Sequence, residues 1–196
     1  MRLLIATTNP GKVGEYQHLL NGLAYELVSL SEVGITREVA ETGATYEENA
    51  LLKAREYAAL SGLLTLADDS GLEVDALGGR PGVHSARYAP DSPARIRQLL
   101  AEMQNIPAGE RNARFQCAIA LAWPDGRAEI TAGTCEGQIA TEARGSNGFG
   151  FDPVFYIPES GLTMAELPEG RKNLISHRAR AAQKMRPILE RILRER

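Results

Sequence analysis

Apolar positions along the chain recur with two different periods, which predicts that strands and helices alternate. Residues 3–7 and 24–30 carry the short apolar runs of buried strands. Between them, a polar turn is followed by apolar residues that recur every three or four positions over residues 13–20, as on one face of a helix. A strand, a polar turn and a helix in this order are typical of the opening of an α/β domain.

The clearest helix is predicted to follow Thr45. Thr45 and Glu48 have the spacing of a capping box, an apolar stripe continues to Ala58, and Gly62 ends the pattern. A buried strand at residues 64–67 then leads directly into two aspartates, which we expect to lie just after the end of that strand.

The second half of the chain predicts a long hairpin followed by helices. Residues 115–123 alternate in polarity, and Asp125-Gly126 is a typical hairpin turn into a second strand. Thr163 and Glu166 have capping-box spacing, which predicts a short helix there, and the apolar stripe of residues 176–192 predicts the last helix.

Composition narrows the class of protein. With 196 residues, the chain is expected to form one large domain or two small lobes with a full core, and 43% hydrophobic and 24% charged residues argue against disorder. A net charge of −3 gives no global attraction to nucleic acid or to a membrane surface, so a polyanion would need a local basic site.

The cysteines and the apolar runs predict a cytoplasmic protein. Cys117 and Cys135 are too few for a disulfide scaffold, and we expect both to be buried thiols in a reducing compartment. The start of the chain lacks the pattern of a secretory signal, and the longest apolar run, residues 117–123, is far shorter than a membrane span.

The turn after the first strand is the first candidate for chemistry. It combines hydroxyl, amide, glycine and lysine side chains just before a helix, where backbone N–H groups and the positive helix end could hold a phosphate. Its spacing is not that of a Walker A loop, and an ordinary strand-to-helix turn explains it equally well. The residues are Thr7, Thr8, Asn9, Pro10, Gly11 and Lys12.

Acidic residues make the second candidate. Asp68 and Asp69 at the end of a buried strand stand where open α/β sheets place ligand groups, and Glu41 belongs to an acidic segment upstream. Adjacent carboxylates need a cation or hydrogen-bond donors, and hard oxygen ligands favour Mg²⁺ or Mn²⁺ over zinc. The alternative is a capped turn with solvated aspartates.

Basic and aromatic residues near the C-terminus make the third candidate. His177 and Arg178 begin a helix, against the preference of the helix dipole, so they could serve an anion or a keto oxygen together with Lys172. A solvated basic surface is the alternative. In the glycine-rich loop upstream, Phe149 could stack on a flat ring, whereas Phe151 is expected in the core. A phosphate cradle, a divalent-metal pocket and an aromatic platform together describe a nucleoside triphosphate site, but they do not say which bond breaks.

The chain resembles the inosine triphosphate pyrophosphatase family over nearly its whole length. Each motif is weak alone, but six occur in one order with matching gaps. They are Thr7-Thr8-Asn9-Pro10-Gly11-Lys12; Glu41-Thr42-Gly43 with Glu48-Asn49-Ala50 and Lys53-Ala54; Ala67-Asp68-Asp69-Ser70-Gly71-Leu72; Pro81-Gly82 with Ser85-Ala86-Arg87-Tyr88; Gly148-Phe149-Gly150-Phe151-Asp152-Pro153; and Ser176-His177-Arg178.

The resemblance implies a fold and an activity. The fold would be α/β, with an elongated central mixed β-sheet flanked by helices, in a single domain of residues 1–196 whose two lobes hold the active site in the cleft between them. The activity would be Mg²⁺-dependent hydrolysis of ITP, dITP and XTP to the monophosphate and pyrophosphate, which removes non-canonical purines from the nucleotide pool. A homodimer is implied, and neither nucleic acid nor membrane is expected as a partner.

Residue roles follow from the same resemblance. Asp69 would be the catalytic base, and Glu41 and Asp69 would hold the metal. The residues implied in substrate binding are Thr7, Thr8, Asn9, Pro10, Gly11, Lys12 and Lys53 for the triphosphate, Ser70, and Phe149, Gly150, Phe151, Asp152, Lys172, His177 and Arg178 for the base.

Physical reasoning about the purine agrees with these roles. Donors such as Arg178 and backbone N–H groups suit a 6-keto oxygen and would leave the 6-amino group of adenine facing donors. GTP also has a 6-keto group, so its rejection must come from the 2-position. Two other hypotheses remain: a pyrophosphatase for modified pyrimidine nucleotides, as in septum-inhibitor-like relatives, and a nucleotide-binding sensor without catalysis.

Overall fold

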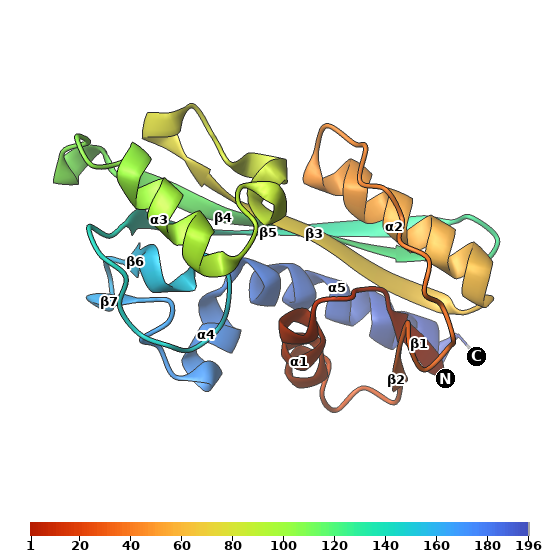
Figure 1. Ribbon diagram of the computed structural model, residues 1–196. Coiled ribbons are helices and arrows are strands. Elements are labelled where there is room, and N and C mark those ends of the chain that lie inside the picture. Colours follow the sequence, from red (N-terminus) through yellow and green to blue (C-terminus); the bar gives the residue numbers. More distant parts are fainter. Residues whose placement is uncertain (196) are drawn as a thin grey trace. The chain divides into compact units, whose positions relative to one another are not determined.

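The computed structural model describes residues 1–195 and has an α/β fold, in which helices flank one seven-stranded sheet (Figure 1). The strands are β1 (Arg2–Ile5), β2 (Glu26–Ser29), β3 (Leu64–Val74), β4 (Asn112–Ala122), β5 (Ala128–Ile139), β6 (Phe155–Ile157) and β7 (Leu162–Thr163). The helices are α1 (Pro10–Leu19), α2 (Tyr46–Ser61), α3 (Ser92–Glu102), α4 (Glu169–Ile175) and α5 (His177–Arg194).

The sheet is mixed, with the strand order β2-β1-β3-β4-β5-β6-β7. β1 pairs in parallel with β2 and β3, so that Leu4 lies opposite Val28 on one side and Thr65 on the other. β6 pairs antiparallel with β5 and β7. The α/β class and the mixed sheet flanked by helices are therefore confirmed, and the predicted hairpin is formed by β4 and β5, which are neighbours in the sheet.

Helix α2 begins and ends where its sequence predicts. The Thr45 side chain accepts from the Glu48 N–H at 3.2 Å, the Glu48 carboxylate accepts from the Thr45 N–H at 3.3 Å, and Gly62 ends the helix in the left-handed conformation. Both ends of the helix are thereby closed by local hydrogen bonds.

The chain divides into two compact units, and β3, β4 and β5 contribute residues to both. Unit 1 comprises residues 1–69, 117–133 and 178–196, and unit 2 comprises residues 70–116 and 134–177.

Within unit 1, α2 lies on one face of the strands and α1 and α5 lie on the other (Figure 1). Alternate residues of β3 and β4, such as Leu66 and Ile119, pack with α1 and α5 in an apolar cluster that includes Tyr16 and Leu189. Because side chains of a strand alternate between its faces, the intervening residues of β3 face α2.

Unit 2 has its own core and a charged strand face. Leu72 of β3, Phe115 of β4 and Phe155 of β6 belong to a cluster with residues of α3 and of the segment before α4. On β4, Arg114 forms ion pairs with Asp75 at 2.9 Å and with Glu136 at 3.3 Å. Buried and polar positions thus alternate along residues 112–117 of β4, as expected for a sheet with one solvated face.

Two local predictions are wrong. Asp68 and Asp69 do not follow a strand; they lie in the middle of the eleven-residue strand β3, where hydrogen bonds and ion pairs from helical residues offset the cost of burying their charges. Thr163 does not begin a helix. Its N–H donates to the Glu166 carboxylate at 2.7 Å, but Thr163 belongs to β7, and α4 begins only after Pro168.

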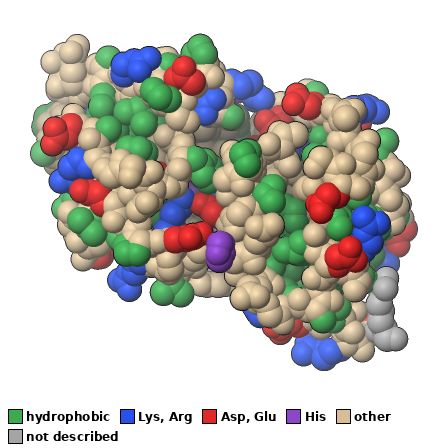
Figure 2. Space-filling view, turned by 60° about the horizontal axis from the view of Figure 1, so that its bottom comes forward, with side chains coloured by type: hydrophobic (Ala, Val, Ile, Leu, Met, Phe, Trp, Pro, Cys, Tyr) green, Lys and Arg blue, Asp and Glu red, His purple; other side chains and the backbone are tan. Residues whose placement is uncertain are grey.

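The surface carries mixed charge. Figure 2 shows Lys and Arg side chains interspersed with Asp and Glu on the visible face, rather than gathered in one patch. Cys117 and Cys135 are both buried, as predicted, and belong to different core clusters. In residues 1–195, no helix has both the length and the apolar composition to cross a membrane.

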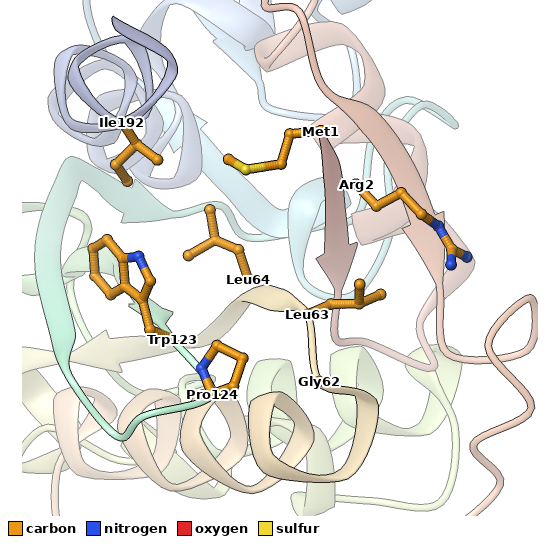
Figure 3. A pocket seen from close by; sticks show the side chains of 8 residues that line it. All are labelled: Met1, Arg2, Gly62, Leu63, Leu64, Trp123, Pro124 and Ile192. Carbon is orange, nitrogen blue, oxygen red and sulfur yellow. The ribbon is translucent and has the colours of Figure 1, made fainter. Parts of the chain in front are cut away.

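Unit 1 also contains an apolar cavity of about 370 Å³ (Figure 3). The Trp123 indole, Leu64 and Ile192 face it, and the Arg2 guanidinium points away from it. Its lining is Met1, Arg2, Gly62, Leu63, Leu64, Trp123, Pro124 and Ile192, which includes none of the residues predicted to act on a nucleotide.

Candidate functional site

The side chains of Asp68 and Asp69 lie on opposite faces of strand β3 within unit 1. Asp68 is 2% exposed and Asp69 is 6% exposed. Asp69 contacts residues of α2, whereas Asp68 contacts residues of α1 and α5. The alternation of a strand therefore separates two carboxylates that are adjacent in sequence, and each has its own set of partners.

On the α2 side, Asp69 and Glu41 share one ammonium group. Lys53 Nζ lies 2.5 Å from Glu41 Oε1 and 3.8 Å from Asp69 Oδ1, and the Asn49 amide donates to Asp69 Oδ2 at 3.0 Å. Burial and the nearby Glu41 raise the pKa of Asp69, although Lys53 and Asn49 oppose the rise. Burial would lower the pKa of Lys53, but the carboxylates around it raise it above its usual range. This cluster keeps two carboxylates close together around one cation.

On the other side, Asp68 is the centre of a buried ion-pair network. Its Oδ2 lies 3.1 Å from Lys12 Nζ and accepts from Arg178 Nε at 3.1 Å and Nη2 at 3.0 Å. Arg178 also donates from Nη1 to Glu15 at 2.6 Å. Burial would raise the pKa of Asp68, but Lys12 and Arg178 hold it well below its usual range. Asp68 Oδ1 is buried and accepts no hydrogen bond from the described part of the chain.

The turn before α1 is held by its own side chains. Asn9 caps the helix, since its Oδ1 accepts from the Gly11 N–H at 2.9 Å and from the Lys12 N–H at 3.4 Å. The Asn9 N–H in turn donates to Thr7 Oγ1 at 3.1 Å. The backbone groups that a phosphate cradle would offer are thus engaged by Asn9, while Thr8 is exposed and Lys12 extends to Asp68.

In unit 2, Asp152 joins the glycine-rich loop to α4. Its Oδ2 accepts from Lys172 Nζ at 2.7 Å and from the Phe149 N–H at 2.9 Å, and Asp152 and Lys172 are 4% and 6% exposed. Lys172 Nζ also lies 5.0 Å from the centre of the Phe149 ring, within range of a cation–π interaction. A Cβ at Gly148 would come within 2.0 Å of Asp152 Oδ2, so only glycine leaves room for this arrangement.

His177 and Phe151 are more deeply buried than Phe149 of the glycine-rich loop. The His177 ring is 7% exposed and stacks on Phe115 with ring centres 4.7 Å apart. Phe151 is 4% exposed and belongs to the core of unit 2, where the sequence predicts it. The loop residue Gly150 has a positive φ of 65°.

The predicted site residues thus fall into two groups. Unit 1 brings together Glu41, Lys53 and Asp69, and unit 2 brings together Phe149, Asp152 and Lys172. Ser70 follows Asp69 directly in β3. Arg178, predicted with the base-recognition residues of unit 2, has its contacts with Asp68 and Glu15 in unit 1. The prediction that the site lies in a cleft between two lobes stays a prediction.

Two functional candidates were missed by the sequence reasoning. Asn49 is fully buried and bonded to Asp69, and Glu15 is bonded to Arg178. A signal for Asn49 exists in the sequence, because it is a polar residue in phase with the apolar stripe of α2. Glu15 has no comparable signal, since its partner is 163 positions away.

The donor set on the α2 side fits a magnesium or manganese ion. No group of three or more His, Cys, Asp or Glu side chains in residues 1–195 forms a complete metal site. Mg²⁺ does not need one, because proteins hold it through one or two carboxylates while waters and substrate phosphates complete the octahedron. Glu41 and Asp69 carry hard carboxylate oxygens of this kind, and both lie near the Lys53 ammonium.

Comparison with known proteins places the chain in a family. The model of the Ham1 family matches residues 3–188. A protein of Bacillus subtilis (strain 168) named dITP/XTP pyrophosphatase is 48% identical over 190 residues, which are 95% of this chain and 96% of that protein. A protein of Symbiobacterium thermophilum with the same name is 50% identical over 99% of this chain and 98% of its own length.

Solved structures agree with the sequence match. A HAM1 protein from Coxiella burnetii superposes with a TM-score of 0.88 at 40% identity, covering 97% of this chain and 99% of that one. The chain therefore belongs to the Ham1 family, which confirms the family that its motifs predict.

Proposed function

We propose that the protein is a nucleoside triphosphate pyrophosphatase that hydrolyses ITP, dITP and XTP to the monophosphate and pyrophosphate. The observation that carries the proposal is the cluster of Glu41, Asp69 and Lys53 in unit 1, which combines two carboxylates with a largely buried ammonium group. The relatives named dITP/XTP pyrophosphatase, which match nearly the full chain, support the same activity and substrate class.

The proposal includes a divalent cation held by Glu41 and Asp69, with Mg²⁺ preferred and Mn²⁺ as a substitute. When bound, the cation would neutralise charge on the phosphate oxygens. Without it, the pKa of Asp69 stays raised, because its own burial and the nearby Glu41 carboxylate disfavour the charged form. A divalent cation would reduce the cost of ionising Asp69 further than the single charge of Lys53 does.

Asp69 is the residue proposed to orient and deprotonate the attacking water. Its carboxylate is held at one oxygen by Asn49 and lies near Lys53 at the other, so its orientation is set before substrate arrives. A base that accepts a proton needs a pKa nearer to neutrality than that of a solvated aspartate, and burial moves Asp69 in that direction. Lys53 and Lys12 would stabilise the charge of the pyrophosphate that leaves.

The purine base is assigned to the residues of unit 2. Phe149 offers a half-buried ring for stacking, and Lys172, oriented by Asp152, offers a cation beside it. Lys172, the loop N–H groups and Arg178 are the donors that the proposal assigns to the 6-keto oxygen. Adenine would present a 6-amino group to the same donors. Because the amino group is itself a donor, the hydrogen bonds made to a 6-keto oxygen would be lost.

Further parts of the proposal concern the remaining predicted residues and the assembly. Residues 7–12 would meet the triphosphate, with Ser70 and His177 as further substrate contacts. The enzyme is proposed to act as a homodimer. It is also proposed to act in the cytoplasm, where the nucleotide pool is found. Sedimentation equilibrium tests the dimer: a mass near twice 21.3 kDa supports it, and a monomer at micromolar concentration contradicts it.

A panel of nucleotides with Mg²⁺ tests the proposed function. Purified protein is incubated with ITP, XTP, GTP, ATP and modified pyrimidine triphosphates, and both products are identified by ion-exchange chromatography. The proposal predicts pyrophosphate and the monophosphate from ITP and XTP, at rates far above that for ATP. Release of orthophosphate, preference for pyrimidines, or tight binding of ITP without turnover would each refute it.

A further inference from the structure

We propose that Asn49 is a positioning residue that holds the Asp69 carboxylate and the segment carrying Glu41 in one arrangement. This inference rests on the proposed function, because it assigns Asn49 a part in the same centre. Asn49 would touch neither the substrate nor the metal. It would act through Asp69 and through the backbone at Gly43.

Both ends of the Asn49 amide are used. The side chain is fully buried, its Nδ2 donates to Asp69 Oδ2 at 3.0 Å, and its Oδ1 accepts from the Gly43 N–H at 2.8 Å. A buried amide without partners would cost free energy, so its presence at this position needs both bonds. One side chain therefore connects strand β3 to the segment that precedes α2.

The segment before α2 packs closely against the first turn of that helix. The Ala44 and Thr45 N–H groups donate to the Glu48 carboxylate at 2.6 and 3.3 Å. A Cβ at Gly43 would come within 2.6 Å of Glu48 Cβ and 2.9 Å of Asn49 Oδ1, so a larger residue would displace the segment. Glu41 lies two positions before this close approach, and it reaches Lys53, one helical turn beyond Asn49.

The two oxygens of Asp69 have different neighbours, which defines the orientation of its carboxylate. Asn49 donates to Oδ2, and Lys53 lies 3.8 Å from Oδ1. A neutral donor orients the carboxylate without adding charge, whereas an aspartate at position 49 would place a third carboxylate beside Asp69 and Glu41. The amide thus suits a centre whose two carboxylates must remain available to a cation. Residues outside the ligand set that orient metal ligands typically contribute 10- to 100-fold to metal affinity or activity.

Substitution at position 49 tests the proposal in two ways. Asn49→Asp keeps the acceptor for the Gly43 N–H but removes the donor to Asp69, and Asn49→Ala removes both. We expect kcat for ITP to fall about 10- to 100-fold in both variants, with KM within about threefold of the wild-type value. Binding of Mn²⁺ without nucleotide, measured by electron paramagnetic resonance, is expected to weaken about tenfold or more in Asn49→Ala.

A control variant separates positioning from simple loss of stability. Asp91 caps α3 in unit 2 through the Ala94 N–H at 2.7 Å, so Asp91→Ala should lower the melting temperature by a few degrees while kcat and Mn²⁺ affinity stay unchanged. If the Asn49 variants prove unstable, Gly43→Ala tests the same arrangement through the backbone and should reproduce the loss of Mn²⁺ affinity.

The outcomes distinguish this inference from the proposed function. Wild-type kcat and wild-type Mn²⁺ affinity in a folded Asn49→Ala variant would overturn the role of Asn49, even if ITP hydrolysis is confirmed. Absence of ITP hydrolysis by the wild-type protein would overturn the proposed function, and the Mn²⁺ measurement would still decide whether Asn49 orients the two carboxylates.

Discussion

Removal of the Asp68 carboxylate should destabilise unit 1 more than any exposed charge substitution. Asp68→Ala leaves Lys12 and Arg178 without the oxygen that both contact, at 3.1 Å from Lys12 Nζ and at 3.0 and 3.1 Å from two Arg178 nitrogens. Arg178 is 1% exposed, so water cannot replace the lost acceptor without opening the core. Glu15, which also accepts from Arg178, then remains as a carboxylate partner for this guanidinium.

The expected loss is a large share of the total stability. Breaking a buried ion pair by removing one partner costs about 3–5 kcal/mol, because the other charge remains buried. A domain has a free energy of unfolding of about 5–15 kcal/mol, so the variant would be marginal. For a chain of this length, the same loss corresponds to a fall in Tm of about 6–20 °C.

Urea unfolding measures this loss. Far-UV circular dichroism follows the helices and strands, and fluorescence of Trp123, the only tryptophan, follows the edge of the unit 1 core. The control is Glu190→Ala, which breaks an exposed pair with Arg186 within α5 and should cost about 0.5 kcal/mol or less. If Asp68→Ala unfolds within about 1 kcal/mol of the wild type, the network does not stabilise the fold as argued.

The pH dependence of the unfolding free energy provides a second test of the contribution of the Asp68 carboxylate. The pKa of Asp68 is lowered in the folded protein, because Lys12 and Arg178 outweigh burial, whereas an unfolded aspartate has a pKa of about 3.9. Its contribution is therefore complete above that pH and is lost as the pH falls further toward the folded pKa. The difference in unfolding free energy between wild type and Asp68→Asn should shrink below about pH 4. A difference that stays constant down to pH 2 would contradict this assignment.

Three further predictions concern the proposed activity. Asp69→Asn should lower kcat for ITP by at least about 100-fold while circular dichroism stays unchanged, and near-normal turnover would remove Asp69 from the mechanism. Chelation by EDTA should abolish hydrolysis without unfolding the protein, and excess Mg²⁺ should restore it; activity that persists in EDTA would contradict the assignment of Glu41 and Asp69 to a cation. Lys172→Met should raise KM for ITP about tenfold or more with a smaller change in kcat, measured by steady-state kinetics; an unchanged KM would exclude Lys172 from recognition of the base.

Features that depend on local sequence could be predicted well. The ends of α2 follow from Thr45, Glu48 and Gly62, whose preferences act within one helical turn. The β4–β5 hairpin follows from alternation and from the turn at Asp125-Gly126, where Gly126 has a positive φ of 89°. In each case the determining contacts join residues close in sequence.

The strand at Asp68 and Asp69 shows where such prediction ends. Two adjacent aspartates have low strand propensity, and a turn is the expected outcome from local preference alone. Tertiary contacts reverse this preference, since Lys12 and Arg178 neutralise one carboxylate and Asn49 and Lys53 hold the other. These partners come from three different helices, so no local sequence pattern predicts their contacts with the two aspartates.

The candidate site shows the same division between local and distant effects. The family resemblance implied Glu41 and Asp69 as metal ligands and Lys53 as a contact of the triphosphate, and the structure brings the three side chains together. The resemblance did not predict that Arg178 would be engaged by Glu15, because that pairing depends on how α1 and α5 pack in unit 1. The supporting residues of a site are harder to infer than its reactive ones, because their chemistry is ordinary and only their position is special.

Hydrolysis of ITP in water enriched in ¹⁸O tests the central claim most directly. In the proposed reaction, water attacks the α-phosphorus next to a cation that Glu41 and Asp69 would hold. Mass spectrometry of the products should therefore show one ¹⁸O in the inosine monophosphate and none in the pyrophosphate. Label in the pyrophosphate, or release of labelled orthophosphate, would place the attack at another phosphorus and contradict the account.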